Sequence, residues 1–90
     1  MPSCRVIIIN KLGLHARASA KFVSVANSFP CQIHIGRELS SLSNGKNIMS
    51  VMMLAASKGT ELHISAEGEQ AEQALAELQK LITRRFDEEC

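Results

Sequence analysis

The sequence predicts an α+β fold, an open-faced two-layer sandwich in which a four-stranded antiparallel sheet carries three helices on one face. Two observations support this prediction. Short segments that are β-branched or that alternate between apolar and polar residues are interspersed with segments whose apolar residues recur every three or four positions. Strands with one apolar face and amphipathic helices bury each other's apolar surfaces, so the element order β-α-β-β-α-β-α favours a sheet covered on one side.

The N-terminal part of the chain supplies the first strand and the first helix. Residues 4–10, CRVIIIN, form a short β-branched run, which predicts a strand apolar enough to lie in the middle of the sheet. A loop over residues 11–14 leads to a helix from about Ala16 to Asn27, and Pro30 prevents its continuation. Its expected buried face follows the spacing i, i+3, i+4, i+7 and comprises Ser19, Phe22, Val23 and Ala26.

Three further strands are expected between Pro30 and the final helix. They are CQIHIG (31–36), the weaker ELSSLS (38–43), which ends at the turn signal Asn44-Gly45, and ELHISAEG (61–68). Alternation turns the isoleucines of the first of these strands toward the helices and places His34 on the opposite face. We expect His34 and His63 to lie on the sheet face exposed to water, with no carboxylate or cysteine partner at ligand spacing.

Two more helices complete the pattern. Residues 47–54, NIMSVMML, predict a short helix for which Asn47 is a good N-cap. The segment from Glu69 to about Arg85 carries the clearest helical pattern, with acidic residues at its start and basic residues at its end, as the helix dipole favours. Its apolar stripe comprises Ala71, Ala74, Leu75, Leu78, Leu81 and Ile82.

Composition excludes several classes of function. The 90 residues suffice for one domain, which we place over residues 1–90, with a modest core. The formal net charge is +1 and the chain has no Trp or Tyr, so it offers neither the basic patch nor the stacking platform that nucleic-acid binding needs. No apolar run approaches the ~20 residues that span a bilayer, and residues 1–10 do not resemble a signal peptide. We therefore expect no nucleic-acid partner and no membrane insertion.

The cysteines indicate a reducing compartment. Cys4, Cys31 and Cys90 are odd in number and share no short spacing, which predicts free thiols and neither a disulfide framework nor a metal site. We expect a cytoplasmic monomer without a bound cofactor.

The stretch Asn10–Phe22, NKLGLHARASAKF, places chemistry at the mouth of the first helix. If Ala16 is the first helical residue, His15 is the N-cap, and its ring lies over the unpaired N–H groups of Arg17 and Ala18. A helix N-terminus is a ready anion site, an imidazole is a nucleophile near neutral pH, and a guanidinium fits phosphate oxygens. This pattern is compatible with phosphoryl chemistry on His15, and equally with an ordinary surface histidine and arginine.

Three segments make the sequence recognisable. NKLGLHARASAKF, GKNIMSVMMLAASKGT and ISAEGEQ match, in order and spacing, the phosphocarrier HPr family of the bacterial phosphoenolpyruvate-dependent phosphotransferase system. The resemblance covers essentially the whole chain. The segments NKLGLHAR and RRFDEE resemble those of the nitrogen-related NPr branch of that family.

The resemblance implies a role for each residue of this motif. His15 would accept a phosphoryl group at Nδ1, as a pros-phosphohistidine, from a phosphorylated enzyme I and pass it to an enzyme IIA protein. Arg17 would orient the phosphate, with the backbone N–H groups of Arg17 and Ala18 close to it. Such a protein is a covalent intermediate in a relay and no stand-alone enzyme.

Two positions depart from the family pattern. Ala18 stands where proline is usual, which should preserve the helix because proline in a first turn costs little, and adds an N–H donor. Asn47 stands where many relatives carry a regulatory serine, so we expect no regulatory serine here.

The short helix suggests where partners dock. It holds more large apolar residues than one buried face can use, and in the family the residues matching Ile48, Met49 and Met52 form an exposed patch. We expect Leu14, Ile48, Met49 and Met52 to form the partner surface, to which adaptable methionines are suited.

Two other functions remain as alternatives. The chain could be a regulatory interaction module whose partner binding is switched by His15 phosphorylation, without sugar transport. A histidine phosphatase is disfavoured, because no carboxylate stands near His15 in sequence to protonate a leaving group, Glu38 being the first acidic residue after it.

Overall fold

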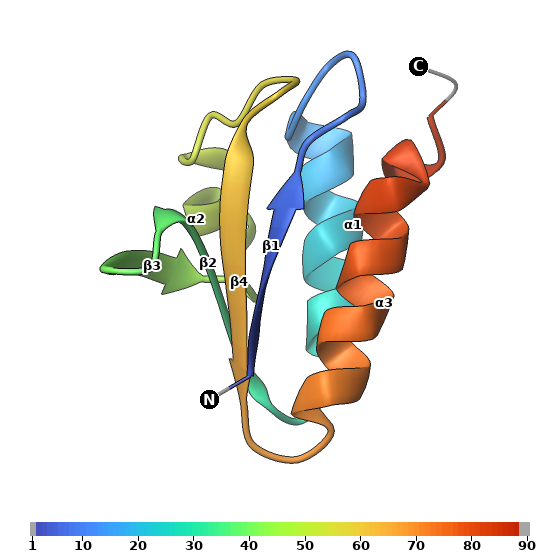
Figure 1. Ribbon diagram of the computed structural model, residues 1–90. Coiled ribbons are helices and arrows are strands. Elements are labelled where there is room, and N and C mark those ends of the chain that lie inside the picture. The colour runs from blue at the N-terminus through green and yellow to red at the C-terminus, as the bar shows by residue number, and fades with distance from the viewer. Residues whose placement is uncertain (1, 89–90) are drawn as a thin grey trace.

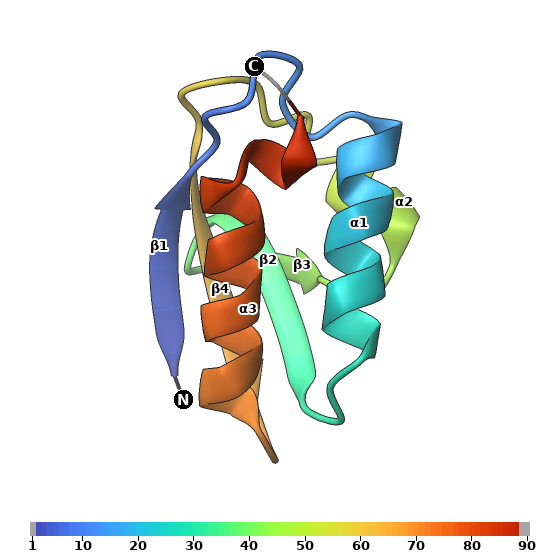
Figure 2. The same ribbon diagram turned by 90° about the vertical axis from the view of Figure 1, so that its right-hand side faces the viewer.

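The computed structural model describes residues 2–88 and confirms the predicted fold class. Its elements are β1 (Ser3–Ile7), α1 (Ala16–Asn27), β2 (Gln32–Glu38), β3 (Ser41–Asn44), α2 (Ile48–Met52), β4 (Glu61–Glu67), α3 (Ala71–Thr83) and a 3₁₀ turn (Arg85–Asp87). The strands form one antiparallel sheet in the order β1-β4-β2-β3. Helices α1 and α3 lie side by side over one face of this sheet, and α2 contacts α1 and β3 (Figures 1 and 2).

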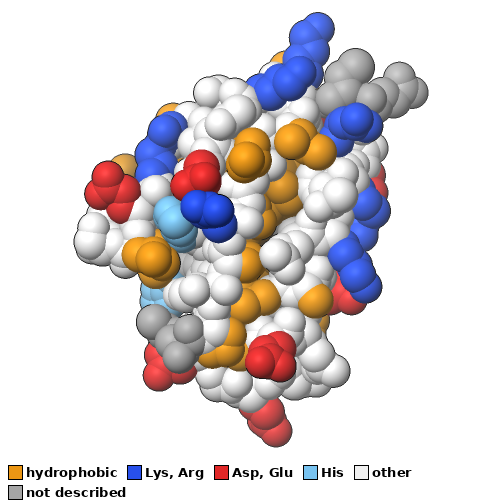
Figure 3. Space-filling model, viewed as in Figure 1, with side chains coloured by type: hydrophobic (Ala, Val, Ile, Leu, Met, Phe, Trp, Pro, Cys, Tyr) orange, Lys and Arg blue, Asp and Glu red, His pale blue; other side chains and the backbone are white. Residues whose placement is uncertain are grey.

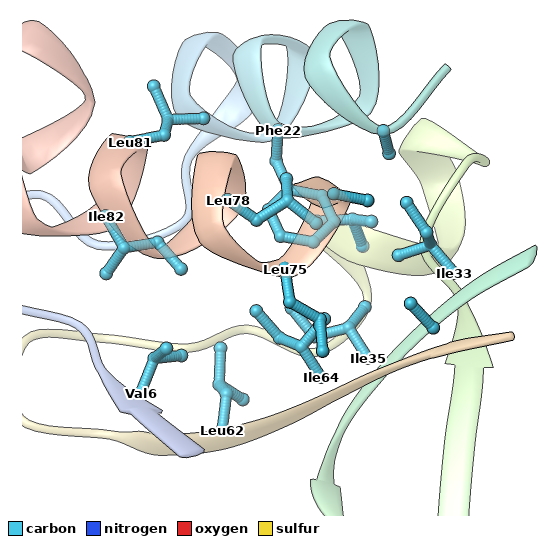
Figure 4. Close-up of a cluster of buried hydrophobic side chains, with 14 of the residues drawn as sticks. Val6, Phe22, Ile33, Ile35, Leu62, Ile64, Leu75, Leu78, Leu81 and Ile82 are labelled. Carbon is cyan, nitrogen blue, oxygen red and sulfur yellow. The ribbon is translucent and has the colours of Figure 1, made fainter. Parts of the chain in front are cut away.

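The core lies between the sheet and the two long helices. The inward residues of the central strand β4 include Leu62 and Ile64, and Ile64 stands opposite Ile35 of β2 in the antiparallel register. Above them, Phe22 of α1 and Leu78 of α3 point into the same cluster (Figure 4), and all five side chains are fully buried. Burying such a side chain stabilises the fold by roughly 1.5–3 kcal/mol, so this cluster holds both helices on the sheet.

The first strand differs from its prediction in place and length. It lies at the edge of the sheet, pairs only with β4, and ends at Ile7, whose side chain is 53% exposed. Ile8 continues beyond the strand, is fully buried, and its N–H donates to the carbonyl of Thr60 at 3.0 Å. Val6 and Ile8 are therefore buried on one face, whereas Ile7 between them is exposed. The strand is not buried on both faces, as a central strand would be.

The final helix is shorter than predicted at both ends. Gly68 and Gln70 adopt left-handed backbone conformations, with φ of +116° and +65°, so the chain enters the helix only at Ala71. The helix ends at Thr83, and a 3₁₀ turn follows in which Phe86 is fully buried. Of the predicted elements, α1 has the bounds that its sequence pattern indicated.

The two strand histidines are less open to water than predicted. His34 and His63 are both half-buried on the sheet face away from α1 and α3. The Nε2 atom of His63 lies 3.8 Å from Oε1 of Glu61, so this histidine has a carboxylate neighbour two residues away on its own strand. Within residues 2–88, no helix has the length and apolar character needed to cross a membrane.

Candidate functional site

A short loop between β1 and α1 positions the start of the helix. Gly13 has φ of +68°, and a Cβ atom there would lie 2.4 Å from the carbonyl oxygen of Ala56, so only glycine fits. The next N–H group, that of Leu14, donates to the same carbonyl at 2.8 Å. Asn10, fully buried, donates through Nδ2 to the carbonyl of Gly13 at 2.8 Å. These contacts fix the direction in which the chain enters α1 at His15.

His15 is the N-cap of α1, as predicted. Its backbone is extended, with φ of −74° and ψ of −178°, and its carbonyl accepts the first helical hydrogen bond, from Ser19 N–H at 2.8 Å. The Nδ1 atom accepts a hydrogen bond from the N–H of Arg17 at 3.2 Å. An acceptor nitrogen carries a lone pair and no proton, so Nδ1 is the unprotonated nitrogen of the ring in this arrangement.

The other ring nitrogen meets a residue that sequence reasoning missed. His15 Nε2 contacts Oε2 of Glu88, and Oε1 of the same carboxylate accepts a hydrogen bond from Asn10 Nδ2 at 3.0 Å. When the ring carries its proton on Nε2, Nε2 can donate to the Glu88 carboxylate and Nδ1 can accept from the Arg17 N–H. Glu88 stands 73 residues from His15 in the chain, so no local spacing could have indicated the pair.

Competing effects act on the Glu88 carboxyl. Partial burial favours its neutral form, whereas hydrogen bonds from Asn10 and His15 and the nearby charges of His15 and Lys21 favour the carboxylate. The favourable contacts prevail, and the pKa of Glu88 lies below its ordinary value. Glu88 is therefore an anionic acceptor at neutral pH.

The turn that ends in Glu88 is held by its own anchors. Arg85, Phe86 and Asp87 all adopt left-handed backbone conformations, with φ of +58°, +55° and +65°. Each non-glycine residue in that region is sterically disfavoured by roughly 1–2 kcal/mol. Burial of Phe86 and a hydrogen bond from Lys21 Nζ to the carbonyl of Phe86, at 2.7 Å, hold the turn against this cost. The end of α3 is thereby brought beside the loop before α1 (Figure 2).

A shallow hollow opens between this turn and the start of α1. Its lining includes three basic side chains and two acidic ones, and comprises Lys11, Leu12, His15, Ala16, Arg17, Lys21, Asp87 and Glu88. Lys and Arg side chains also gather at this end of the molecule in the space-filling view, near the loop after β1 and the end of α3 (Figure 3). The helix N-terminus adds a partial positive charge, so the hollow is suited to an anion.

Comparison with known proteins identifies the family. Residues 2–84 match the family described as "PTS HPr component phosphorylation site". The chain belongs to the HPr family of the phosphotransferase system. It is 60% identical over 88 residues to the phosphocarrier protein HPr of Pseudomonas aeruginosa, covering 98% of each chain.

Solved structures of the HPr family agree with the fold. The chain superimposes on HPr-C-His from Thermoanaerobacter tengcongensis with a TM-score of 0.93 and 40% identity, covering 100% of both chains. An HPr dimer from the same organism matches with a TM-score of 0.75 and 40% identity, covering 98% of this chain and 100% of the other. These relatives show that the chain is a phosphocarrier of the phosphotransferase system.

The expected partner surface of this HPr-family chain needs one correction. Leu14 is only 5% exposed, because its N–H bond to Ala56 draws the loop against the core, so Leu14 presents almost no surface to a partner. Ile48 and Met49 are 38% and 62% exposed, and Met52 is half-buried. Two exposed residues were not predicted, Met53 at 79% and Leu12 at 68%. Only Val51 of α2 is fully buried, and the other apolar side chains of this helix reach the surface.

Asn47 caps α2 as the sequence predicts. Its Oδ1 atom accepts a hydrogen bond from the N–H of Ser50 at 3.1 Å. The side chain satisfies a helix N–H group and offers no hydroxyl, so this chain lacks a phosphorylatable group at position 47.

Two of the three cysteines lie in the described residues. Cys4 is half-buried, Cys31 is buried, and both are free thiols. Burial raises the pKa of the Cys4 thiol, which makes it less reactive. Cys90 lies outside the described residues. Within residues 2–88, no three His, Cys, Asp or Glu side chains are grouped so that they could hold a metal ion.

Proposed function

We propose that His15 carries the phosphoryl group, on Nδ1. The observation that supports this assignment is the hydrogen-bond arrangement of the ring, in which Nδ1 carries a lone pair toward the helix mouth while Nε2 faces Glu88. The Nδ1 lone pair forms the new N–P bond as the bond between phosphorus and the donor breaks, and the donor leaves with its electron pair. On transfer to an acceptor, the imidazole leaves in the same way.

Two neighbours stabilise the bound phosphoryl group. Arg17 is exposed on the first turn of α1, where its guanidinium can reach phosphate oxygens from the side. The backbone N–H groups of Arg17 and Ala18 belong to the first turn, whose N–H groups have no acceptor within the helix. Each such contact contributes about 1 kcal/mol when partly exposed, which holds the phosphoryl group without trapping it.

The donor and the acceptor are proteins in this account. An enzyme I-type phosphotransferase phosphorylates His15, and an enzyme IIA-type protein receives the group. Ile48, Met49 and Met52 form the core of the partner surface, extended by Met53, because exposed methionines adapt to differently shaped partners. Leu12 lines the hollow beside His15, where a docked partner would contact it.

We propose the remaining features on the sequence patterns alone, since the relay itself does not require them. The chain acts as one domain over residues 1–90, in the cytoplasm, as a monomer without a cofactor, and within the nitrogen-related NPr branch. The HPr dimer of T. tengcongensis makes the oligomeric state a matter for measurement by sedimentation.

A phosphatase is disfavoured on new grounds. Glu88 does place a carboxylate beside His15, contrary to what the sequence suggested. This carboxylate, however, contacts Nε2, on the side of the ring away from Nδ1, and its pKa is lowered. An anionic acceptor in that position does not protonate a leaving group. His15 therefore acts as a carrier in a relay, and the chain is not a stand-alone enzyme in this proposal.

A regulatory interaction module is the second candidate. The exposed apolar side chains of Met49 and Met53 favour it, since they offer a contact surface whether or not phosphate is transferred onward. In that case phosphorylated and unphosphorylated protein bind a partner with different affinity, while no phosphoryl group reaches an enzyme IIA-type acceptor.

The test is phosphorylation by phosphoenolpyruvate and a purified enzyme I, followed by intact mass and acid treatment. The proposal predicts an acid-labile gain of one phosphoryl group in the native chain and in a His34→Ala control, and none in His15→Ala. Phosphorylation that persists in His15→Ala would show that another residue is the carrier. Adding an enzyme IIA protein separates the relay from the regulatory module, because only the relay discharges the phosphohistidine.

A further inference from the structure

We propose that Glu88 is a positioning residue that fixes the proton of the His15 ring on Nε2 and so keeps Nδ1 ready for phosphorylation. This inference rests on the proposed role of His15. It assigns a function to the C-terminal turn, which the family match over residues 2–84 does not include.

The two ring nitrogens have partners of opposite kind. The Arg17 N–H can only donate, so it requires a lone pair on Nδ1. The Glu88 carboxylate can only accept, so it requires a proton on Nε2. A single tautomer satisfies both partners, and the other tautomer would set a proton against the N–H and a lone pair against the carboxylate.

Glu88 is itself held in place. Its side chain is 16% exposed, its Oε1 atom accepts from Asn10 at 3.0 Å, and Asn10 is fully buried and bound to Gly13 in the loop that carries His15. Asn10 therefore connects the carboxylate to the backbone that sets the ring position. The left-handed turn before Glu88 is anchored by buried Phe86, so the carboxylate is delivered by the fold and not by a freely moving tail.

This arrangement suits phosphoryl transfer at the opposite nitrogen. Since Nδ1 carries no proton, the N–P bond can form without proton removal. The positive charge that develops on the ring as that bond forms is balanced by the carboxylate at Nε2. When the phosphoryl group leaves, the ring keeps its Nε2 proton and regains the Nδ1 lone pair, so one cycle restores the starting state.

Other charged groups surround the pair and must be accounted for. Asp87 belongs to the turn and its Oδ2 atom lies 3.8 Å from Lys21 Nζ, and Lys11 and Arg17 line the same hollow. Asp87 also contacts Arg84, at 3.1 Å, but makes no contact with His15 among the described residues. Because Asp87 also lines the hollow, the control is Glu77→Gln, which removes an exposed carboxylate of α3 that lies 3.9 Å from Lys80 Nζ and outside the hollow.

The experiment compares wild type, Glu88→Gln and Glu77→Gln. The first readout is ¹⁵N NMR of the His15 ring in unphosphorylated protein, at a pH about two units above the ordinary histidine pKa of ~6.5. In wild type and Glu77→Gln, we expect the proton on Nε2. In Glu88→Gln the amide can donate as well as accept, so only the Arg17 N–H still selects this tautomer, and we expect a larger share of rings protonated on Nδ1 than in wild type. An unchanged ring spectrum in Glu88→Gln would overturn the proposal.

The second readout is the rate of phosphorylation by enzyme I. We expect kcat to fall roughly tenfold in Glu88→Gln, the lower end of what loss of an orienting partner costs, with KM unchanged because docking is not affected. Glu77→Gln should stay within about twofold. A fall in kcat equal in both variants would be a general effect of losing a carboxylate and would overturn the proposal. If wild type takes up no phosphoryl group while its ring spectrum responds to Glu88→Gln, the proposed carrier role fails and not the contact itself.

Discussion

The molecule contains two helix N-caps that look alike and do different work. Asn47 begins α2 and His15 begins α1, both with extended backbone, and both accept a hydrogen bond from a backbone N–H in the first turn. Asn47 accepts at 3.1 Å from the N–H three residues on, the usual N-cap geometry. His15 accepts at 3.2 Å from the N–H two residues on, and its second nitrogen contacts Glu88.

Under the proposed function, the comparison explains how a cap can also be a reactive group. The amide oxygen of Asn47 accepts a hydrogen bond from the helix, and the amide nitrogen is not nucleophilic. An imidazole caps the same kind of N–H through the atom that can also form a bond to phosphorus, while its other nitrogen remains free for an orienting partner. The proposed carrier role therefore accounts for a histidine at the start of α1, since an asparagine or serine would cap the helix at least as well.

Replacing one cap with the other gives the largest expected effect. His15→Asn should abolish acid-labile phosphorylation by enzyme I, because no nucleophilic nitrogen remains. Asparagine is among the best N-caps, so the free energy of unfolding should change by less than about 1 kcal/mol. Intact mass and urea denaturation measure the two effects. A fall of several kcal/mol in the free energy of unfolding would show that His15 has a structural role beyond capping.

Removing the anchor of the C-terminal turn comes next. Phe86→Ala should lower the free energy of unfolding by about 3–5 kcal/mol, since Phe86 is fully buried, and should release Glu88 from His15. The α2 cap lies outside this turn and should keep its hydrogen bond. Denaturation of Phe86→Ala beside Gln79→Ala, an exposed position on α3, measures the cost. Equal stability in the two variants would mean that the turn contributes little.

Removing the α2 cap should have a smaller effect, and on stability instead of phosphorylation. Asn47→Ala should cost about 1 kcal/mol of stability, the usual effect of losing an N-cap oxygen. Phosphorylation of His15 should proceed at its normal rate, since Asn47 is no part of the hollow. Asn47→Ser keeps a capping oxygen and serves as the control. A loss of phosphorylation in Asn47→Ala alone would show that docking on the partner surface depends on this cap.

The pH dependence of stability gives the smallest effect. Because the folded pKa of Glu88 is lowered, its contribution is fully present above the ordinary carboxyl pKa of 4.5 and is lost as pH falls through the folded value. His15 and Lys21 face this carboxylate, and both remain in the comparison variant. The stability difference between wild type and Glu88→Gln should therefore narrow below pH 4.5. A difference that is constant from neutral to acid pH would contradict the lowered pKa.

Local patterns carried most of the fold prediction. The start of α1 at Ala16 and the cap at Asn47 follow from signals within a few residues, and the structure has both. The place of β1 in the sheet could not be predicted, because β-branched residues favour edge and central strands alike. The delayed start of α3 depends on the left-handed turn at Gly68 and Gln70, which the periodicity of the helix does not reveal.

The site was predictable only where it is local. His15 and Arg17 are two residues apart, and the helix mouth follows from the chain itself. Leu14 was placed on the surface wrongly, since its burial depends on a contact with Ala56, far along the chain. Glu88 reaches the ring only because Phe86 is buried and the turn is left-handed, neither of which a charged tail in the sequence indicates.

The central claim is that Nδ1 of His15 carries the phosphoryl group, and the spectrum of the phosphorylated protein tests it most directly. Protein labelled with ¹⁵N in histidine, phosphorylated by enzyme I and phosphoenolpyruvate, should show one-bond coupling between phosphorus and Nδ1 of His15, with the proton on Nε2. Coupling to Nε2 of His15, or to a nitrogen of His34 or His63, would contradict the account.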